Sequence, residues 1–341
     1  MINQIYRLVS PRQFEVTYKD VNITSNLVVV RPTHLSICAA DQRYYTGTRG
    51  EEAMKKKLPM ALIHEGVGVV AYDPSGELLS GTKVVMVPNN PIEEDKFVAE
   101  NYLRSSQFAS SGYDGFMQDY VLLNRNRLVV LPDNIDMNIA AFTELVTIAT
   151  HAISRFEHIS IKRRGTFGVW GDGNLGFITS LLLKKIYPKC KVLLFGKTDY
   201  KMSNFSFVDE VYDIYDVQAN VQIDHGFECV GGRGSSMAIN QMIDHIKPEG
   251  SMSILGVSEF PVEINTRMVL EKGLIIIGSS RSGVADFEKT VEIYKQYPEV
   301  IDYLSILVGN VLKVKSIEEV TAAFDLDLSS SWGKTVMKWG I

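Results

Sequence analysis

The sequence predicts an α/β protein with two domains, one partly β and the other a parallel sheet doubly wound by helices. The chain has 341 residues, which corresponds to two domains at about 100 to 200 residues each. Residues 1–130 contain short β-branched runs cut by turn residues, whereas from Thr166 onward apolar strands, glycine turns and helices alternate. Hydrophobic residues make up 45% of the chain and charged residues 22%, so the composition does not support a disordered or fibrous protein.

The individual elements are expected as follows. In the N-terminal part, strands are predicted at 26–31, 66–71, 83–88 and 119–124, with a turn at 73–76. In the middle of the chain, strands are predicted at 166–170, 191–195, 223–230, 251–256 and 274–278, and helices at 174–187 and 235–246, the second ended by residues 247–250. The tail predicts a helix at 286–297 and a last strand at 334–339.

The charge balance and the N-terminal sequence argue against several classes of function. Lysine and arginine number 35 against 40 for aspartate and glutamate, a net charge of −5, so no basic field favours nucleic acid or an anionic membrane. The longest apolar runs are far shorter than the roughly 20 residues that cross a bilayer, and the N-terminus does not have the pattern of a secretory signal. The three cysteines, Cys38, Cys190 and Cys229, are scattered and do not form a disulfide framework. We therefore expect a cytoplasmic protein with neither nucleic acid nor a membrane as its partner.

A glycine motif follows directly after the predicted strand 166–170. It reads Gly171-Asp172-Gly173-Asn174-Leu175-Gly176 and opens the helix predicted at 174–187. In a G-x-G-x-x-G motif the first glycine allows a tight turn, the second lets the backbone approach a pyrophosphate, and the third lets helix and strand pack closely. Because strand, helix and a further strand are all predicted, the motif indicates a dinucleotide-binding site rather than a simple glycine turn.

The residues beyond this motif favour NADPH over NADH. An NAD-binding sheet usually ends its second strand with Asp or Glu, about 20 residues beyond the glycines, where the carboxylate accepts hydrogen bonds from the ribose. Here Gly196 stands at the strand end, and Lys197, Thr198 and Lys201 follow. Lysines beside a 2′-phosphate are favourable, whereas a carboxylate would repel it. The alternative is that Asp199 turns back to the ribose while the lysines are solvated.

Three residues of the N-terminal part could hold a metal ion. Cys38 ends the apolar segment that begins at Leu27, and His64 and Glu65 precede the glycine-bearing strand. Thiolate sulfur, imidazole nitrogen and carboxylate oxygen together suit zinc, with one position left for water or substrate. The distance between Cys38 and His64 in the sequence is too wide for a zinc finger, so the fold would have to bring them together. The residues alone favour the alternative of a buried thiol and a hydrogen-bonded core histidine.

Several segments occur in the order found in zinc-dependent medium-chain dehydrogenases, and the chain resembles this family nearly from end to end. The segments are Cys38-Ala39-Ala40-Asp41, His64-Glu65-Gly66-Val67-Gly68, Gly81-Thr82-Lys83-Val84, residues 115–121, Glu144-Leu145 with His151-Ala152, and Gly171 to Gly176. Residues 41–47 and the Glu144 position resemble the polyol dehydrogenase branch, which acts on sorbitol and xylitol. Residues 36–47 and 257–263 are most similar to the ribulose-5-phosphate reductases, or ribitol-5-phosphate dehydrogenases, of wall teichoic acid synthesis.

The resemblance implies both the architecture and the reaction. It implies a zinc-bearing, GroES-like, partly β catalytic domain formed by residues 1–145 and 283–341, and a Rossmann domain formed by residues 146–282. The implied reaction is reduction of D-ribulose 5-phosphate by NADPH to D-ribitol 5-phosphate, at one catalytic zinc in a cleft between the domains, with the product supplied to teichoic acid synthesis.

The resemblance also assigns residues. The implied catalytic residues and zinc ligands are Cys38, His64, Glu65 and Glu144, with Glu65 either binding zinc directly or exchanging with water or substrate. Asp41 would orient the ligands by hydrogen bonds, and His151 is expected to be a packed helical histidine rather than a ligand. Ser279 and Arg281 follow the last sheet strand, where the family's chain passes the nicotinamide. Arg281 would contact a cofactor phosphate or only fix its loop.

The sequence departs from the family pattern in two ways. Many relatives hold a second, structural zinc in a lobe of four close cysteines, but residues 89–112 contain none, so we expect one zinc per chain. Many relatives also have a Ser or Thr and a His in a proton relay, where this chain has Ala40 and Arg43. A zinc-bound water or Glu65 would then pass the proton. Arg43, next to Tyr44, would hold the substrate phosphate, pair with the cofactor pyrophosphate or pair with a nearby carboxylate.

Two other functions remain as alternatives. One is a dehydrogenase of unphosphorylated polyols, which uses the same chemistry. The other is a non-catalytic nucleotide-binding relative, against which the presence of all four implied zinc ligands argues. The family also leads us to expect a homo-oligomer, a dimer or tetramer, and a cytidylyltransferase that consumes ribitol 5-phosphate.

Overall fold

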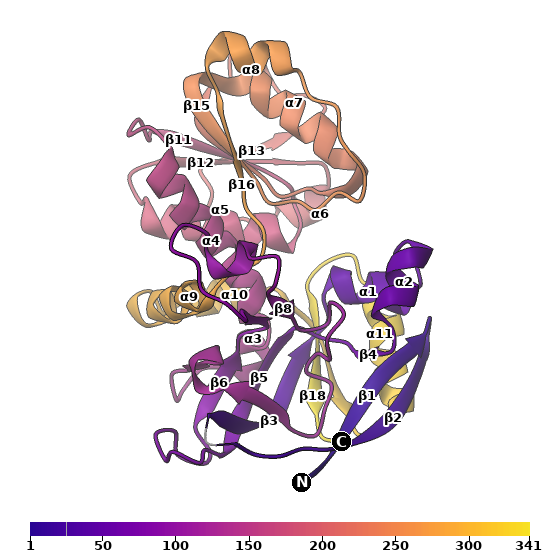
Figure 1. Cartoon of the computed structure of the whole chain (residues 1–341). Helices are drawn as coiled ribbons and strands as arrows, with labels where there is room; N and C mark the ends of the chain where they lie inside the picture. Colours follow the sequence, from indigo (N-terminus) through magenta and orange to yellow (C-terminus); the bar gives the residue numbers. More distant parts are fainter. Residues whose placement is uncertain (25) are drawn as a thin grey trace. The chain divides into compact units, whose positions relative to one another are not determined.

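The computed structural model describes residues 1–24 and 26–341, which divide into two compact units (Figure 1). Unit 1 combines Met1–Leu145 with Ser282–Ile341, and unit 2 comprises Val146–Arg281. Each unit contains a sheet and a buried apolar cluster of its own. Within the described ranges, no helix has both the length and the apolar character needed to cross a membrane.

Unit 1 is built mainly of strands. Their bounds are β1 Ile2–Ser10, β2 Gln13–Asp20, β3 Leu27–Ser36, β4 Met60–Ala61, β5 Glu65–Tyr72, β6 Lys83–Met86, β7 Asn89–Asn90, β8 Gln107–Phe108, β9 Val121–Asn124, β10 Leu128–Val130, β17 Val308–Val314 and β18 Lys334–Trp339. The main sheet of the described residues has the order β10-β6-β5-β3-β18-β17, and β9 also pairs with β3. Because β5 and β18 both run antiparallel to β3, both begin at the sheet edge where β3 ends.

All four strands predicted for the N-terminal part are present, in β3, β5, β6 and β9. The hairpin of β1 and β2 was not predicted. Its turn includes Arg12, whose φ of 61° lies in the left-handed region, and it buries Tyr6, Leu8 and Phe14 against the core of unit 1. The predicted last strand, 334–339, coincides with β18.

Unit 1 also contains short helices around its sheets. Their bounds are α1 Ala39–Tyr45, α2 Glu51–Lys57, α3 Met137–Ala140, α9 Val284–Gln296, α10 Glu299–Ser305 and α11 Ile317–Ser329, with 3-10 turns at Glu100–Tyr102 and Arg125–Arg127. The helix predicted at 286–297 is α9. Helix α4, Thr143–Ile159, begins in unit 1 and continues into unit 2.

Glu100 holds the segment between β7 and β8 in place. Its Oε1 accepts hydrogen bonds from Nη1 of Arg127 at 2.9 Å and from the backbone N of Val284 at 2.8 Å. Arg127 is buried and also donates to the backbone oxygen of Asn89. A Cβ at Gly283 would lie 2.8 Å from the same Oε1, so a larger residue there would displace the Glu100 side chain from this position. An ion pair therefore ties this segment to the rest of unit 1.

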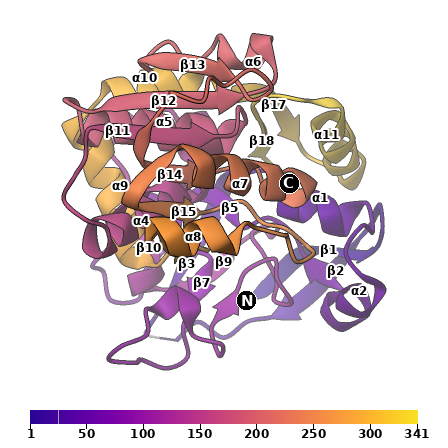
Figure 2. The same ribbon diagram turned by 90° about the horizontal axis from the view of Figure 1, so that it is seen from above.

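Unit 2 is a parallel sheet with helices on both faces. Its strands are β11 Thr166–Trp170, β12 Lys191–Gly196, β13 Glu210–Asp213, β14 Ile223–Glu228, β15 Ile246–Ile254 and β16 Ile275–Gly278, and its helices include α5 Asn174–Ile186, α6 Asp199–Met202, α7 Ser235–His245 and α8 Thr266–Lys272. The described strands have the order β13-β12-β11-β14-β15-β16 (Figure 2). Helices α7 and α8 lie on one face and α5 on the other (Figure 1). The predicted doubly wound sheet is confirmed.

The start of one predicted strand in unit 2 differs from the structure. Helix α7 ends at His245, before residues 247–250, as predicted, but β15 begins at Ile246 rather than at residue 251, so residues 247–250 lie inside it. Ile223 of β14 pairs with Ile246, and His225 pairs with Ser251, so the intervening residues of β15 are accommodated as an irregularity in the ladder. Glu249 lies in this irregular part of β15 and has a φ of 62°, in the left-handed region.

Candidate functional site

Three metal-donor side chains meet at one edge of the main sheet of unit 1. Cys38 follows the end of β3, while His64 and Glu65 stand at the beginning of β5. Glu65 pairs with Ser36 across the two strands, which places Cys38 just beyond this pair. One donor atom from each of Cys38, His64 and Glu65 lies within 4.8 Å of the other two. The antiparallel pairing of β3 and β5 thus makes the site that the spacing alone could not show.

Asp41 contacts two members of this group, Cys38 and His64. Its carboxylate accepts hydrogen bonds from the backbone N of Cys38 at 3.2 Å, the backbone N of Ile63 at 3.0 Å and Oγ of Ser110 at 2.6 Å. Its Oδ1 lies 3.6 Å from Nδ1 of His64. Burial alone would raise the pKa of Asp41, but His64 and these hydrogen bonds outweigh burial and lower it. The carboxylate in turn raises the pKa of His64 against the opposing effect of burial.

Lys334 is a member of the site that the sequence analysis did not identify. Its Nζ donates a hydrogen bond to Oε1 of Glu65 at 2.9 Å, and both side chains are buried. Burial alone would lower the pKa of Lys334, but Glu65 and Cys38 outweigh it and raise the pKa, so the amine is charged. No local motif marks Lys334, because it is the first residue of an ordinary strand, 269 positions from Glu65.

Glu144 lies near the three donors without belonging to their compact group. It stands in the first turn of α4 and is 4% exposed. Burial raises the pKa of its carboxyl to about 7, opposed by the charge of His64 and reinforced by that of Glu65. Glu144 is therefore within electrostatic reach of the donors. His151, two turns later on α4, is buried and belongs to unit 2.

The donor set fits zinc. It offers a soft sulfur, an imidazole nitrogen and a carboxylate oxygen, as in zinc sites that keep a position open for catalysis. Oε2 of Glu65 is buried and has no hydrogen-bond partner among the residues that the structure describes. A buried carboxylate oxygen without a partner is unfavourable, so a cation at this point would satisfy it.

The glycine motif of unit 2 forms a turn between β11 and α5. Gly171 has a φ of 128°, and a Cβ there would lie 2.9 Å from the backbone oxygen of Cys229. A Cβ at Gly176 would lie 1.8 Å from the backbone oxygen of Gly171, so only glycine fits. A Cβ at Gly173 would meet no atom within 4 Å, so this backbone faces open space at the helix N-terminus, beside Asn174 and Leu175. An open backbone at a helix N-terminus suits a pyrophosphate.

Asp172, inside the motif, holds the end of β12. Its Oδ2 accepts hydrogen bonds from the backbone N of Lys197 at 3.0 Å and of Thr198 at 2.8 Å. A Cβ at Gly196 would lie 2.9 Å from Cβ of Asp172 and 2.6 Å from Sδ of Met202, so a carboxylate side chain does not fit there. The sequence analysis gave Asp172 no role, although an acid between two motif glycines could have suggested one.

Because Asp172 occupies the backbone amides of Lys197 and Thr198, the side chains of these two residues remain available at the end of β12. Lys197 is exposed, and Thr198 and Lys201 are half-buried. Asp199 begins the short helix α6.

Arg43 and Tyr44 lie in the last turn of α1, close in sequence to Cys38. Arg43 is half-buried and Tyr44 is 1% exposed. Two further cations contact the Tyr44 ring, with Cζ of Arg49 at 4.7 Å and Nζ of Lys57 at 5.8 Å from its centroid. Positive side chains therefore gather around this helix end.

The loop after β16 has one strained residue. Arg281 has a φ of 58°, a left-handed conformation that costs a non-glycine residue free energy. Ser279 is buried, and its backbone N donates to the oxygen of Ile254 at 3.0 Å. Cys229 is also buried, with its thiol directed at Oγ1 of Thr179, and burial raises its pKa.

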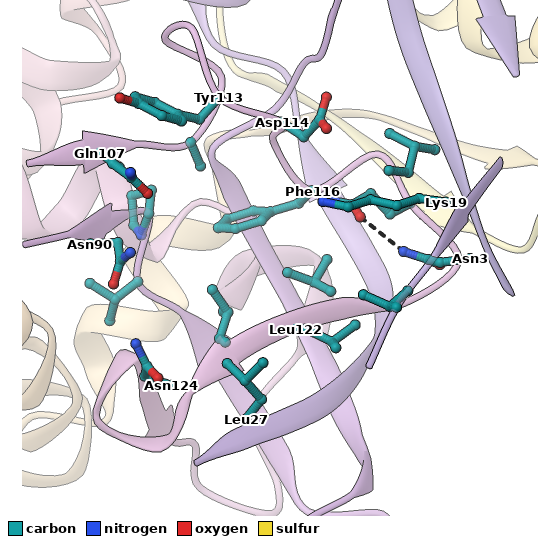
Figure 3. Close-up of a pocket in the computed structure, with 18 residues that line it drawn as sticks. Asn3, Lys19, Leu27, Asn90, Gln107, Tyr113, Asp114, Phe116, Leu122 and Asn124 are labelled. Carbon is teal, nitrogen blue, oxygen red and sulfur yellow. Dashed lines mark hydrogen bonds between the residues drawn. The ribbon is translucent and has the colours of Figure 1, made fainter. Parts of the chain in front are cut away.

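A separate hollow of about 380 Å³ lies in unit 1. Asn90 and Gln107 lie at one end and Asn3 and Lys19 at the other, with Phe116 between them (Figure 3). None of the predicted site residues lines it.

Comparison with known proteins places the chain among dehydrogenases. Residues 24–133 match the alcohol dehydrogenase GroES-like domain. The chain is 67% identical to the ribulose-5-phosphate reductase of Bacillus spizizenii over 100% of both chains, and 62% identical to ribulose-5-phosphate reductase 1 of Staphylococcus aureus over 99% of both. The crystal structure of S. aureus TarJ in complex with NADPH matches with a TM-score of 0.90 and 58% identity, covering 100% of both chains. L-idonate 5-dehydrogenase from Escherichia coli, at 21% identity and a TM-score of 0.85, shares the fold.

We predict one bound zinc per chain, held by a thiolate-containing site. Cys38→Ser should lose the metal and the activity together while the fold remains, because the remaining nitrogen and oxygen donors bind zinc less well. Elemental analysis of the purified chain measures this, with Cys190→Ser as the matched control at a cysteine outside the site. Two zinc ions per chain, or an active enzyme without zinc, would contradict the prediction.

Proposed function

Because the chain belongs to the family of ribulose-5-phosphate reductases, we propose that it reduces D-ribulose 5-phosphate to D-ribitol 5-phosphate with NADPH. The observation that carries this proposal is full-length identity of 67% to such an enzyme, together with the compact group of Cys38, His64 and Glu65. The alternative of a non-catalytic relative would not require this compact donor group.

In this proposal, the residues of unit 1 hold a zinc ion and orient the substrate. Cys38, His64 and Glu65 supply donors, and Glu144 stands nearby as a fourth. Asp41 fixes two of them, since it binds the backbone N of Cys38 and faces His64. When bound, zinc supplies Lewis acidity at the C2 carbonyl oxygen and NADPH supplies the hydride. Ala40 has no hydroxyl to relay a proton, so Glu65 is the side chain proposed to pass it.

The residues of unit 2 would hold the cofactor. The open backbone at Gly173 and the N-terminus of α5 are proposed to receive the pyrophosphate, since amide groups and the helix dipole favour negative charge. Lys197, Thr198 and Lys201 are proposed to meet the 2′-phosphate through their side chains. Ser279 is proposed to contact the cofactor, and Arg281 is proposed either to contact a cofactor phosphate or to fix its loop.

We extend the proposal to the cellular setting. The enzyme would work in the cytoplasm as a homodimer or homotetramer. Its product would serve wall teichoic acid synthesis through a cytidylyltransferase that uses ribitol 5-phosphate.

Turnover of sugar substrates tests the proposed reaction directly. Ribulose 5-phosphate with NADPH should be reduced with a kcat/KM at least about tenfold above that for ribulose, because one charge-assisted contact to phosphate contributes roughly that factor. NADPH oxidation followed at 340 nm measures both. Equal rates for ribulose and its phosphate would favour the polyol dehydrogenase alternative.

We predict that Lys197→Glu reverses part of the cofactor preference. The new carboxylate would repel a 2′-phosphate and leave NADH, which has none, nearly unaffected. The KM for NADPH should rise by at least about tenfold while that for NADH changes little. Lys191→Glu serves as the control, because Lys191 is an exposed lysine at the other end of β12 that pairs with Glu210. Equal kcat/KM for the two cofactors in the unmodified enzyme would refute the assignment.

Arg43 is predicted to hold the substrate phosphate. Arg43→Ala should lower kcat/KM for ribulose 5-phosphate by at least about tenfold, equivalent to the loss of about 1.5 to 3 kcal/mol from a bidentate contact. NADPH binding should stay unchanged, and the advantage over ribulose should shrink. Arg12→Ala is the matched control, because Arg12 is exposed and stacks on the neighbouring Tyr45. Weaker NADPH binding with an intact phosphate preference would assign Arg43 to the cofactor.

A further inference from the structure

We propose that Lys334 is a positioning residue that keeps Glu65 a weak and exchangeable ligand of the metal. The inference rests on the zinc site of the proposed function. It concerns a residue from the far end of the chain that acts on the reaction only through Glu65.

The sheet brings Lys334 to the site. Strand β3 ends at Ser36, where Glu65 of β5 is its partner on one side and Val336 of β18 its partner on the other. Both neighbours run antiparallel to β3, so Lys334 stands at the same edge as Glu65. The backbone N of Ile37 donates to the oxygen of Thr335 at 3.0 Å, which fixes β18 beside the segment leading to Cys38.

The two oxygens of Glu65 have different surroundings. Oε1 accepts the hydrogen bond from Nζ of Lys334 at 2.9 Å. Glu65 is 0% exposed, and its Oε2 has no hydrogen-bond partner within the described part of the chain. One oxygen is therefore held by a fixed cation, and the other is left for a second positive partner. The ammonium selects which oxygen is available.

The ammonium also weakens the carboxylate as a ligand. A carboxylate that shares its charge with a buried ammonium attracts a metal ion less than an unshared one. If Glu65 leaves the metal, it still has Lys334 as a counter-ion, so no buried charge is left uncompensated. A substrate oxygen can then take the vacated position. Without Lys334, the metal would be the main counter-charge of Glu65, and exchange would be suppressed.

Two negative groups besides Glu65 also stabilise the charged form of Lys334. Cys38 and Asp327 both favour its charged form in addition to Glu65. Asp327 itself accepts a hydrogen bond from Nε2 of Gln42 at 2.8 Å, which engages it elsewhere. Glu65 is the group to which Lys334 donates directly.

The test compares Lys334→Met with the conservative variant Lys334→Arg. In the full-length enzyme, Lys334→Met should bind zinc at least about tenfold more tightly in competition with a chelator, because the metal becomes the counter-ion of Glu65. The kcat/KM for ribulose 5-phosphate should fall by at least about tenfold, with the KM for NADPH unchanged. Lys334→Arg should restore both values toward those of the unmodified enzyme. Unchanged or weaker zinc binding in Lys334→Met would overturn the proposal.

A double-mutant cycle shows whether Lys334 acts through Glu65. In the Glu65→Gln background, Lys334→Met should change zinc affinity by less than about twofold. A tenfold effect that persists without the Glu65 charge would overturn the proposal. If Lys334→Met does not fold, Lys334→Gln replaces it in both arms.

A spectroscopic readout reports the exchange itself. Cobalt-substituted enzyme should change its visible absorption when ribulose 5-phosphate is added, and cobalt-substituted Lys334→Met should not. A spectrum of the unmodified enzyme that is unaffected by substrate would overturn the proposal. Absence of zinc from the unmodified enzyme would instead refute the proposed function, so the two failures are distinguishable.

Discussion

The candidate metal site depends on the burial of one carboxylate, Asp41. A buried charge is stable only when hydrogen bonds and opposite charge surround it. Asp41 obtains them from the backbone at Cys38 and Ile63, from the Ser110 hydroxyl and from His64. These groups come from separate segments, and displacing any of them removes one of the contacts that compensate the charge of Asp41. The short helix α1 would not persist alone, so this network also keeps the helix in place.

The charges around Asp41 explain why a cation belongs there. Asp41, Glu65 and Glu144 are buried carboxyl groups, and Lys334 is the buried lysine among them. The raised pKa of Glu144 reflects mainly the cost of burying its negative charge, reinforced by the charges of Glu65 and Asp41. A divalent ion would remove that cost, since bound cations dominate the local electrostatics of such sites. Unit 2 favours an anion instead of a cation. The open backbone at Gly173 and the N-terminus of α5 carry partial positive charge, which attracts negative groups.

Sequence patterns predict the parts of this protein that are local. The strands and helix around Gly171 to Gly176 follow from periodicity, because the motif, its strand and its helix are contiguous. Cys38, His64 and Glu65 are recognisable as donors, but only the pairing of β3 with β5 brings them within 4.8 Å. Lys334 could not be found, because its role comes from the register of β18 and no residue near it in the sequence shares that role. Asp172 was missed for a related reason, since its partners at Lys197 and Thr198 lie on the next strand.

The Glu100–Arg127 ion pair holds its segment without a metal ion. A segment held by cysteines and zinc would loosen when the metal is lost or the thiols are oxidised. Residues 89–112 contain no cysteine, and the segment is fastened by a carboxylate, a guanidinium and the backbone of Val284. Such contacts need neither a metal supply nor a reducing environment. If the donor group around Cys38 lost a bound metal, the contacts of Glu100 would be unaffected, because none of them involves a metal ligand.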